Sequence, residues 1–291
     1  SVIADKVKHE EVAYLKTERG KFTIQCVMLA ALALVQPRFA MTSQKPWNYP
    51  LFVAHRGGGT LAPENTLSAM RTGVKFGYKM AEYDVKLSQD GVAILMHDAT
   101  LERTTNGVGH AGNLSFAELA ALDAGSWFGP DFAGETIPTL AAVARYTQAV
   151  GMASNIEIKP TPGLEMITGS RVAEIAQSLW AAALPQPLLS SFSVDSLRAA
   201  KAAVPALPRG WITDSLQAGW QQTVVELECV SIHLKHTLVT KPLIAELRQM
   251  GLRIAVWTVN DPVRASELLD WGIDALITDA LDRIHPGERI V

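Results

Sequence analysis

The chain has 291 residues, of which 48% are hydrophobic and 19% are charged, a composition that suits a folded protein with a sizeable core. Its formal net charge is -3 and it has no long run of Lys or Arg, which argues against a nucleic-acid partner. Its two cysteines, Cys26 and Cys229, are too few for a disulfide framework and are not spaced as metal ligands.

The first forty residues differ from the rest of the sequence. A charged stretch precedes an apolar stretch over residues 22–35, which is shorter than the ~20 residues of a membrane span. One interpretation is a signal peptide over residues 22–40 and export of the protein. The alternative, which we favour, is a native start at Met41 and a cytoplasmic protein without stable membrane insertion. We therefore expect residues 1–48 to be an N-terminal extension and residues 49–291 to be the main domain.

From residue 51 onward, short β-rich runs alternate with helical stretches, a pattern that predicts a parallel sheet. The segment 49–291 is close to the ~250 residues of a (β/α)8 TIM barrel, so we expect this α/β fold. The expected strands are Leu51–Ala54, Met80–Leu87, Val92–His97, Ala153–Ile158, Leu188–Phe192, Gly210–Thr213, Cys229–Leu234, Arg253–Val259 and Ile273–Thr278. The expected helices are Thr66–Phe76, Ser115–Leu122, Thr139–Val150, Ser170–Ala183, Val194–Val204, Pro242–Met250 and Pro262–Trp271.

These strand candidates exceed the eight places of a barrel by one. The pair Asp90-Gly91 favours a turn, so we expect residues 80–97 to form a hairpin with one arm partly outside the barrel. Residues from about 99 to 138 are rich in Gly and Pro, and we interpret them as a small insertion that helps to shape the site. The alternative fold, a doubly wound open sheet, usually carries a G-x-G-x-x-G loop, which Gly57-Gly58-Gly59 does not match.

Three carboxylates lie in the expected strands. Glu82 and Asp84 are two residues apart, so both side chains point to one face, where they repel each other unless a cation binds. Glu157 adds a third carboxylate, and carboxylate oxygens are the ligands of Mg²⁺ and Ca²⁺. Lys159 shares a face with Glu157, so a simple salt bridge between these two is the alternative interpretation.

Two histidines end expected strands. His55 is followed by Arg56, and a hairpin that turns at Asp90-Gly91 places His97 opposite Asp84. Such a set suits cleavage of a phosphodiester, which is anionic and repels a nucleophile until its charge is neutralised by a metal and by arginine. Imidazoles with pKa values near neutrality can take a proton from the attacking hydroxyl and give one to the leaving alkoxide.

Ordered motifs extend from residue 49 to about residue 285. They are Phe52-Val53-Ala54-His55-Arg56-Gly57, Ala62-Pro63-Glu64-Asn65-Thr66, Glu82-Tyr83-Asp84, His97-Asp98, Leu101-Glu102-Arg103-Thr104-Thr105-Asn106-Gly107, Asn155-Ile156-Glu157-Ile158-Lys159, Ser190-Ser191-Phe192, Val256-Trp257-Thr258-Val259-Asn260 and Ile277-Thr278-Asp279. Together they resemble the glycerophosphodiester phosphodiesterase family, and most closely its compact cytoplasmic bacterial form associated with glycerol-3-phosphate uptake.

The resemblance implies a distorted TIM barrel of the phospholipase C-like phosphodiesterase type. It implies hydrolysis of small glycerophosphodiesters, such as glycerophosphocholine, to sn-glycerol 3-phosphate and an alcohol. The glycerol 2-hydroxyl would act as nucleophile and give a cyclic phosphate that water opens. Residues matched to family roles are His55 and His97 as the acid–base pair, Glu82, Asp84 and Glu157 as ligands of one Mg²⁺ or Ca²⁺ ion, and Arg56 and Lys159 as phosphate-binding residues.

Five further positions have two interpretations each. Glu64 is expected near the metal and Asn65 is expected to brace the site, but the same segment could simply cap a helix. Phe192 and Trp257 are expected to wall the pocket, and ordinary barrel core is the alternative. His233 would either line the pocket or be a hydrogen-bonded structural residue.

Two other functions remain open from the sequence. A sphingomyelinase D-like or lysophospholipase D-like enzyme would share the barrel and the site, but should carry a larger apolar rim. A non-enzymatic binding protein on a barrel scaffold would lack part of the catalytic set, and no position is missing. The sequence indicates neither the oligomeric state nor a protein partner.

Overall fold

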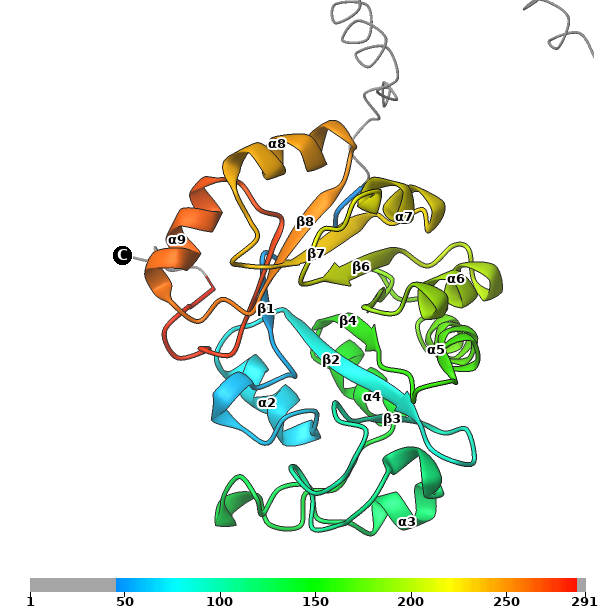
Figure 1. Cartoon of the computed structure of the whole chain (residues 1–291). Helices are drawn as coiled ribbons and strands as arrows, with labels where there is room; N and C mark the ends of the chain where they lie inside the picture. Colours follow the sequence, from blue (N-terminus) through cyan, green and yellow to red (C-terminus); the bar gives the residue numbers. More distant parts are fainter. Residues whose placement is uncertain (1–45, 287–291) are drawn as a thin grey trace, which may run out of the picture. The chain divides into compact units, whose positions relative to one another are not determined.

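A computed structural model of the chain describes residues 46–286, so the expectations of a signal peptide over residues 22–40 and of a native start at Met41 lie outside the described residues. Eight parallel strands form a barrel whose strands alternate with helices along the chain (Figure 1). The barrel strands are β1 (Phe52–Ala54), β2 (Met80–Leu87), β4 (Ala153–Ile158), β5 (Leu188–Ser191), β6 (Arg209–Thr213), β7 (Ser231–Lys235), β8 (Arg253–Trp257) and β9 (Ala275–Thr278).

The barrel closes where its first strand meets its last. Strand β1 pairs in parallel with β2 through Ala54 and Ala81, and with β9 through Phe52 and Leu276. Since no open edge remains between these eight strands, the (β/α)8 prediction is confirmed and the doubly wound open sheet is excluded.

The helices lie outside the ring, and most begin at a side-chain cap. Thr66, for example, accepts a hydrogen bond from the backbone N–H of Ala69 over 3.1 Å and so starts the first long helix. The helices are α2 (Leu67–Lys75), α3 (Phe116–Ala120), α4 (Leu140–Ala149), α5 (Glu165–Leu179), α6 (Val194–Ala203), α7 (Trp220–Glu226), α8 (Lys241–Gln249) and α9 (Pro262–Asp270).

Two helices differ from the sequence prediction. Helix α5 begins at Glu165, five residues before the expected Ser170, and its cap residue Leu164 makes no side-chain cap bond. Helix α7 was not expected, and it follows Gly219, which has a φ of 87° and also provides no side-chain cap. Both helices therefore start without the polar capping residue that marks a helix start in a sequence.

Strand β3 (Ala93–Leu95) is the hairpin arm that lies outside the ring. It pairs antiparallel with β2 alone, which confirms the expected hairpin. The predicted register is wrong by one residue, because Val85 pairs with Leu95 and the N–H of Met96 donates to the carbonyl of Asp84 over 3.1 Å. Asp84 therefore lies opposite Met96 and not opposite His97.

The length of the hairpin loop explains this shift. Three residues, 89–91, connect the strands, and Gly91 has a φ of 78°. The N–H of Gly91 donates to the carbonyl of Ser88, and the N–H of Ser88 donates to the carbonyl of Val92, each over 3.0 Å. A three-residue loop is centred on Asp90, whereas the prediction assumed a two-residue Asp-Gly loop.

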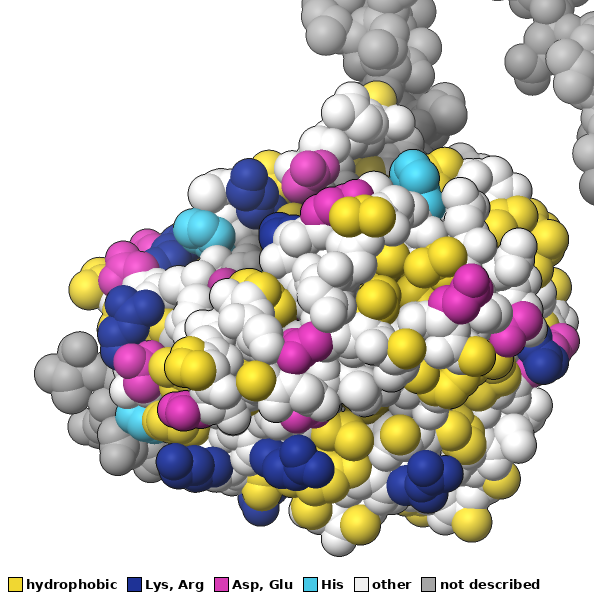
Figure 2. All heavy atoms as spheres, turned by 90° about the horizontal axis from the view of Figure 1, so that it is seen from below, with side chains coloured by type: hydrophobic (Ala, Val, Ile, Leu, Met, Phe, Trp, Pro, Cys, Tyr) yellow, Lys and Arg dark blue, Asp and Glu magenta, His cyan; other side chains and the backbone are white. Residues whose placement is uncertain are grey.

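The insertion after β3 has a small core of its own. It contains α3 and two short 3-10 helices, η2 (Ala111–Asn113) and η3 (Pro130–Phe132), while a third, η1 (Gly59–Leu61), follows β1. Leu101, Leu119 and Ile137 are buried together beneath β3. Figure 2, which views the molecule from below Figure 1, shows charged side chains scattered among hydrophobic ones.

The amino-terminal end of the barrel is filled by apolar side chains. Val53, Met80 and Leu188 are buried there, and Trp47 and Tyr49 pack against this cluster. The Tyr49 hydroxyl also donates to the carbonyl of Gln186 over 2.8 Å. Within residues 46–286, no helix is long and apolar enough to cross a membrane.

Candidate active site

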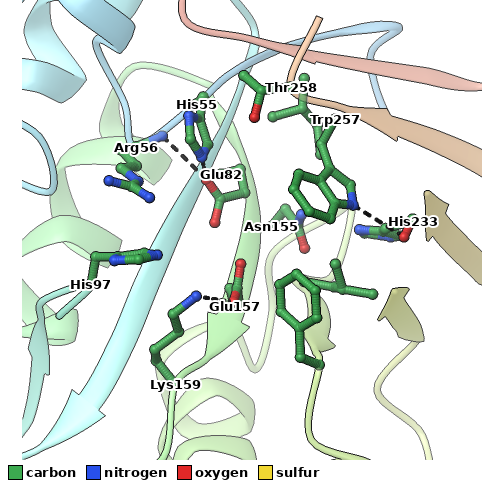
Figure 3. Close-up of a pocket in the computed structure, with 13 residues that line it drawn as sticks. His55, Arg56, Glu82, His97, Asn155, Glu157, Lys159, His233, Trp257 and Thr258 are labelled. Carbon is green, nitrogen blue, oxygen red and sulfur yellow. Dashed lines mark hydrogen bonds and ion pairs between the residues drawn. The ribbon is translucent and has the colours of Figure 1, made fainter. Parts of the chain in front are cut away.

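A cavity of about 150 Å³ opens at the carboxyl ends of the barrel strands (Figure 3). Parallel strands present the side chains at and after their carboxyl ends to one common face, which is where TIM barrels bind substrates. Eight of the expected site residues line this cavity. They are His55, Arg56, Glu82, His97, Glu157, Lys159, Phe192 and Trp257.

The three expected carboxylates come together as a buried cluster. Glu82, Asp84 and Glu157 each offer an oxygen atom, and these atoms lie within 4.8 Å of one another. Asp84 is in register with Glu157 on the neighbouring strand, so the pairing of β2 with β4 places both carboxylates on one face. We refer to these three residues as the carboxylate cluster.

The charges of the carboxylate cluster are incompletely balanced by the protein. Burial and then the charge of Asp84 raise the pKa of Glu82 to about 8, and the same two causes raise the pKa of Glu157. Burial also opposes ionisation of Asp84, but Lys159 and other nearby cations lower its pKa to about 2. A cluster of hard oxygen donors that repel one another fits a divalent cation such as Mg²⁺ or Ca²⁺.

Asn65 is turned toward the carboxylate cluster. Its Nδ2 donates to Oδ2 of Asp84 over 2.8 Å, and its Oδ1 accepts from the N–H of Asp84 over 3.0 Å. Asn65 has a φ of 60°, a conformation that asparagine tolerates better than most residues, and Thr66 rather than Asn65 caps α2. Asn65 therefore fixes the carboxylate of Asp84.

His55 is held by a carboxylate at one ring nitrogen and faces the cavity with the other. Its Nδ1 lies 2.5 Å from Oδ1 of Asp279, and its Nε2 lies 3.8 Å from Oε2 of Glu82. Asn260 in turn donates to Oδ2 of Asp279 over 3.0 Å and accepts from its backbone N–H over 2.8 Å. Burial lowers the pKa of His55, but the bond to Asp279 and the charge of Glu82 outweigh it, so the pKa is raised.

His97 is also held by an aspartate at its Nδ1 atom. Its Nδ1 lies 2.7 Å from Oδ1 of Asp98, and Arg103 donates from Nε to Oδ2 of Asp98 over 2.6 Å. Burial lowers the pKa of His97, and the positive charges of Lys159 and Arg56 lower it further, against the opposing charge of Asp84. Figure 3 shows His55 and His97 on the same side of the cavity, on different strands.

Arg56 and Glu64 form an ion pair beside the carboxylate cluster. Nη1 of Arg56 donates to Oε1 of Glu64 over 2.8 Å, and its Nε lies 3.6 Å from Oδ2 of Asp84. Glu64 also accepts from Nη1 of Arg103 over 2.7 Å. Glu64 thus contacts two arginines, and it lies outside the carboxylate cluster.

Lys159 lies beside two members of the carboxylate cluster. Its Nζ lies 2.6 Å from Glu157 and 3.5 Å from Asp84, so the expected salt bridge forms, and the side chain also lines the cavity. Phe192 and Trp257 form an aromatic wall, with ring centroids 5.4 Å apart at an interplanar angle of 80°. Phe192 is 43% exposed, so it lies at the cavity mouth rather than in the barrel core.

Sequence reasoning assigned no role to the residues that hold the two imidazoles. These are Asp279 with Asn260, and Asp98 with Arg103. All four stand in the ordered motifs, and Asp279 directly follows the last strand. Asp98 is adjacent to His97 in the chain, whereas Asp279 is 224 positions from His55, so only the closed barrel reveals that second contact.

Comparisons with known proteins point to one family. The model of the glycerophosphoryl diester phosphodiesterase family matches residues 55–283. The YhdW protein of Bacillus subtilis is 35% identical over 239 residues, which are 80% of this chain and 95% of that protein. A glycerophosphodiester phosphodiesterase of Caldanaerobacter subterraneus is 33% identical over 234 residues, which are 79% of this chain and 93% of that protein.

A solved structure extends the likeness to three dimensions. It is an Oleispira antarctica phosphodiesterase in complex with the product sn-glycerol-3-phosphate. The TM-score is 0.78 at 36% sequence identity, with 81% of this chain and 95% of the other chain covered. The closed barrel, the site residues in their expected order and a family match over most of the sequence lead to one conclusion: this chain belongs to the glycerophosphoryl diester phosphodiesterase family.

Proposed function

We propose that the protein hydrolyses small glycerophosphodiesters to sn-glycerol 3-phosphate and an alcohol, with one divalent cation and with His55 and His97 as the acid–base pair. One observation carries the proposal: two imidazoles, each fixed at Nδ1 by an aspartate, line the same cavity as Glu82 and Glu157 of the carboxylate cluster. A general acid and a general base must both reach one reacting group, and this arrangement meets that requirement. The product in the Oleispira complex supports the proposed product here.

The cavity also suits an anionic substrate. Arg56 and Lys159 line it and would hold the phosphate. Glu82, Asp84 and Glu157 would hold Mg²⁺ or Ca²⁺, which would add positive charge beside the phosphate and acidify a bound hydroxyl.

The protons would pass through the free ring nitrogens. With Nδ1 of each imidazole bound to an aspartate, Nε2 remains for exchange with substrate. One imidazole would take the proton of the glycerol 2-hydroxyl as its oxygen attacks phosphorus. The other would protonate the leaving alkoxide, and water would then open the cyclic phosphate as the two imidazoles exchange roles.

Release of sn-glycerol 3-phosphate from glycerophosphocholine tests this function directly. We expect release by the wild-type protein with Mg²⁺ or Ca²⁺, and loss of release in EDTA. His55→Ala and His97→Ala should each lower kcat by about 10²- to 10⁴-fold, because each removes one proton-transfer group. His110→Ala, which changes a residue outside the cavity, is the matched control and should keep its activity.

Absence of release from the folded wild-type protein with either metal would overturn the proposal. In that case the lipid alternatives become the next test, with lysophosphatidylcholine and sphingomyelin as substrates. The cytoplasmic location is also a proposal, and fractionation of cells that express the full chain or a chain starting at Met41 tests it. Recovery of the full chain outside the cytoplasm would favour the signal-peptide interpretation instead.

A further inference from the structure

The inner end of the cavity holds two buried polar groups that the proposed reaction does not use. Asn155 and His233 both line the cavity, and each is 1% exposed. Oδ1 of Asn155 and Nδ1 of His233 have no hydrogen-bond partner among the described residues. A buried polar atom without a partner is costly, so such atoms in a cavity indicate a ligand group that completes them.

The position of His233 depends on two neighbours. Its Nε2 lies 3.0 Å from Oγ of Ser231, which leaves Nδ1 as the ring nitrogen available to the cavity. Gly210 on β6 makes room for the ring, because a Cβ atom there would collide with His233 Nε2 and would lie 2.6 Å from Oγ of Ser231. Burial lowers the pKa of His233 to about 3, so the ring is neutral and suits an uncharged partner.

Asn155 lies beside the carboxylate cluster but deeper in the barrel. It is in register with Glu82 on β2 and precedes Glu157 by two residues on β4, so all three side chains lie on one face. Figure 3 shows Asn155 and His233 on the Trp257 side of the cavity, whereas His97 and Lys159 lie on the other side. The cavity therefore has a charged half for phosphate and an uncharged polar half.

Resting on the proposed function, we propose that His233 and Asn155 bind the free terminal hydroxyl of the glycerol moiety and thereby select deacylated substrates. In a glycerophosphodiester, the carbon that carries the 2-hydroxyl connects the phosphate-bearing carbon to the terminal hydroxymethyl group. With the phosphate beside Arg56 and Lys159, the hydroxymethyl group reaches the uncharged half of the cavity. The leaving alcohol then extends toward the open mouth beside Phe192.

This subsite would discriminate against lysophospholipids. An acyl ester at the terminal hydroxyl removes its proton donor and adds a chain that must fit a cavity of about 150 Å³. The lining of the cavity also includes the apolar side chains of Ile212 and Ile277, which offer no hydrogen bond to an ester. Such a site rejects an analogue without the hydroxyl more strongly than apolar contacts alone could, because its polar groups then stay unpaired.

A pair of substrates tests the subsite in the wild-type protein. One is glycerophosphocholine, and the other is the phosphocholine ester of propane-1,2-diol, in which a methyl group replaces the hydroxymethyl group while the attacking hydroxyl is kept. We expect kcat/KM to be roughly 10- to 100-fold higher for glycerophosphocholine, as follows from leaving buried polar atoms unpaired.

Variants then assign the preference to its residues. His233→Leu and Asn155→Leu should each reduce the preference for glycerophosphocholine several-fold, with the propanediol ester still hydrolysed. His233→Asn, which keeps a polar atom near the place of Nδ1, should restore part of the preference. His110→Ala, which changes a residue outside the cavity, should keep the full preference.

Three outcomes would overturn the inference. Equal kcat/KM for the two substrates in the wild-type protein would refute the subsite while the proposed function stands. An unchanged preference in both leucine variants would place recognition of the hydroxyl elsewhere. Hydrolysis of neither substrate by the folded wild-type protein would refute the proposed function, and the subsite with it.

Discussion

At the scale of single residues, Asn65 connects a strained backbone position with the carboxylate cluster. Both polar atoms of its amide bind Asp84, while its φ of 60° is one that most side chains disfavour. The short polar side chain of asparagine can meet both demands, whereas alanine meets neither.

Two substitutions at Asn65 separate the effect of its hydrogen bonds to Asp84 from the effect of its positive φ. Asn65→Gly removes the bonds to Asp84 but tolerates the positive φ, whereas Asn65→Ala removes the bonds and also strains the backbone. We expect both variants to bind the divalent cation about 10- to 100-fold more weakly, since hydrogen bonds to a metal ligand orient it. The unfolding free energy of Asn65→Ala should also be about 1–2 kcal/mol lower than that of Asn65→Gly, because only alanine is strained at the positive φ.

Calorimetric titration with Mg²⁺ or Ca²⁺ and urea unfolding without metal measure the two effects. Unchanged metal affinity in Asn65→Gly would show that Asp84 does not need this support. Equal stability of the two variants would show that the positive φ carries no cost.

His233 makes the stability of the fold depend on pH. Its pKa of about 3 in the folded protein lies below the ~6.5 of an unfolded histidine, so the unfolded chain binds the extra proton. The contribution is therefore complete above pH 6.5 and is lost as the pH falls toward 3. At pH 5 this single group costs about 2 kcal/mol relative to neutral pH.

Urea unfolding at pH 7 and pH 5 tests this linkage. The wild-type protein should lose about 2 kcal/mol more than His233→Leu between the two pH values, because all other titrating groups are shared. Parallel losses in the two proteins would mean that His233 takes up a proton in the folded state without penalty.

Most residues of the candidate site, but not all of their contacts, could be predicted from the sequence. Eight of the expected residues line one cavity, because alternation along strands decides which side chains share a face. The aspartates that hold the imidazoles were given no role, although they stand in the motifs. A hydrogen bond between residues 224 positions apart, such as that of His55 with Asp279, depends on barrel closure and leaves no local pattern.

At the scale of elements, the loop after β1 is packed against the loop after β9. Gly59 has a φ of 55°, and a Cβ atom there would collide with the carbonyl of Asp279. The same carbonyl accepts a hydrogen bond from the N–H of Thr60 over 3.0 Å. The glycine therefore allows η1 to approach the residue that holds His55.

We expect Gly59→Ala to lower both stability and kcat, since the added methyl group must displace the backbone of Asp279. Gly77→Ala is a matched control, because Gly77 also has a positive φ, of 83°, but its Cβ would meet nothing within 4 Å. The control should lose about 1–2 kcal/mol from backbone strain and keep its kcat. Thermal unfolding and steady-state kinetics compare the two, and equal kcat values would contradict the proposed coupling.

Elements were predicted well where periodicity and caps agree. All nine expected strands form within a few residues of their predicted bounds. The hairpin register failed by one residue, because two- and three-residue loops share the Asp-Gly signal and differ only in backbone conformation. Helix α7 was missed because it has seven residues and no polar cap.

At the scale of the whole molecule, repulsion within the carboxylate cluster should make the stability of the fold depend on a bound cation. Three buried carboxylates within 4.8 Å destabilise the folded barrel when no cation is bound. Binding to the folded state alone stabilises it by about 2.7 kcal/mol at a metal concentration of 100 Kd. For a protein of this size that corresponds to a rise in Tm of roughly 5–10 °C.

Thermal unfolding in EDTA and in excess Mg²⁺ or Ca²⁺ measures this rise. Glu82→Gln removes one carboxylate that would bind the cation, so it should reduce the rise in Tm with metal. Glu174→Gln, on the outer helix α5, should behave like the wild-type protein in both conditions. A full metal-dependent rise in Glu82→Gln would place the cation outside the carboxylate cluster.

The extent of the barrel unit remains our proposal. Trp47 and Tyr49 pack against the apolar end of the barrel, so the folded unit includes residues just before the expected start at residue 49. Composition and length could predict the barrel because the β-then-α rhythm fills one closed ring. They could not predict where the extension ends, because two aromatic residues give no periodic signal.

The pairing of β1 with β9 joins the first and last strands of the barrel, so the site depends on residues from both ends of the barrel domain. The carboxylate cluster is complete once β4 has formed, but the aspartate that holds His55 arrives with almost the last residues of the chain. A chain that ends before residue 279 would still contain the three carboxylates proposed to hold the cation. Its His55 would lack the hydrogen bond to Asp279. We therefore expect copies that lack Asp279 to be poor catalysts of the proposed reaction, so that activity would report the pairing of β1 with β9.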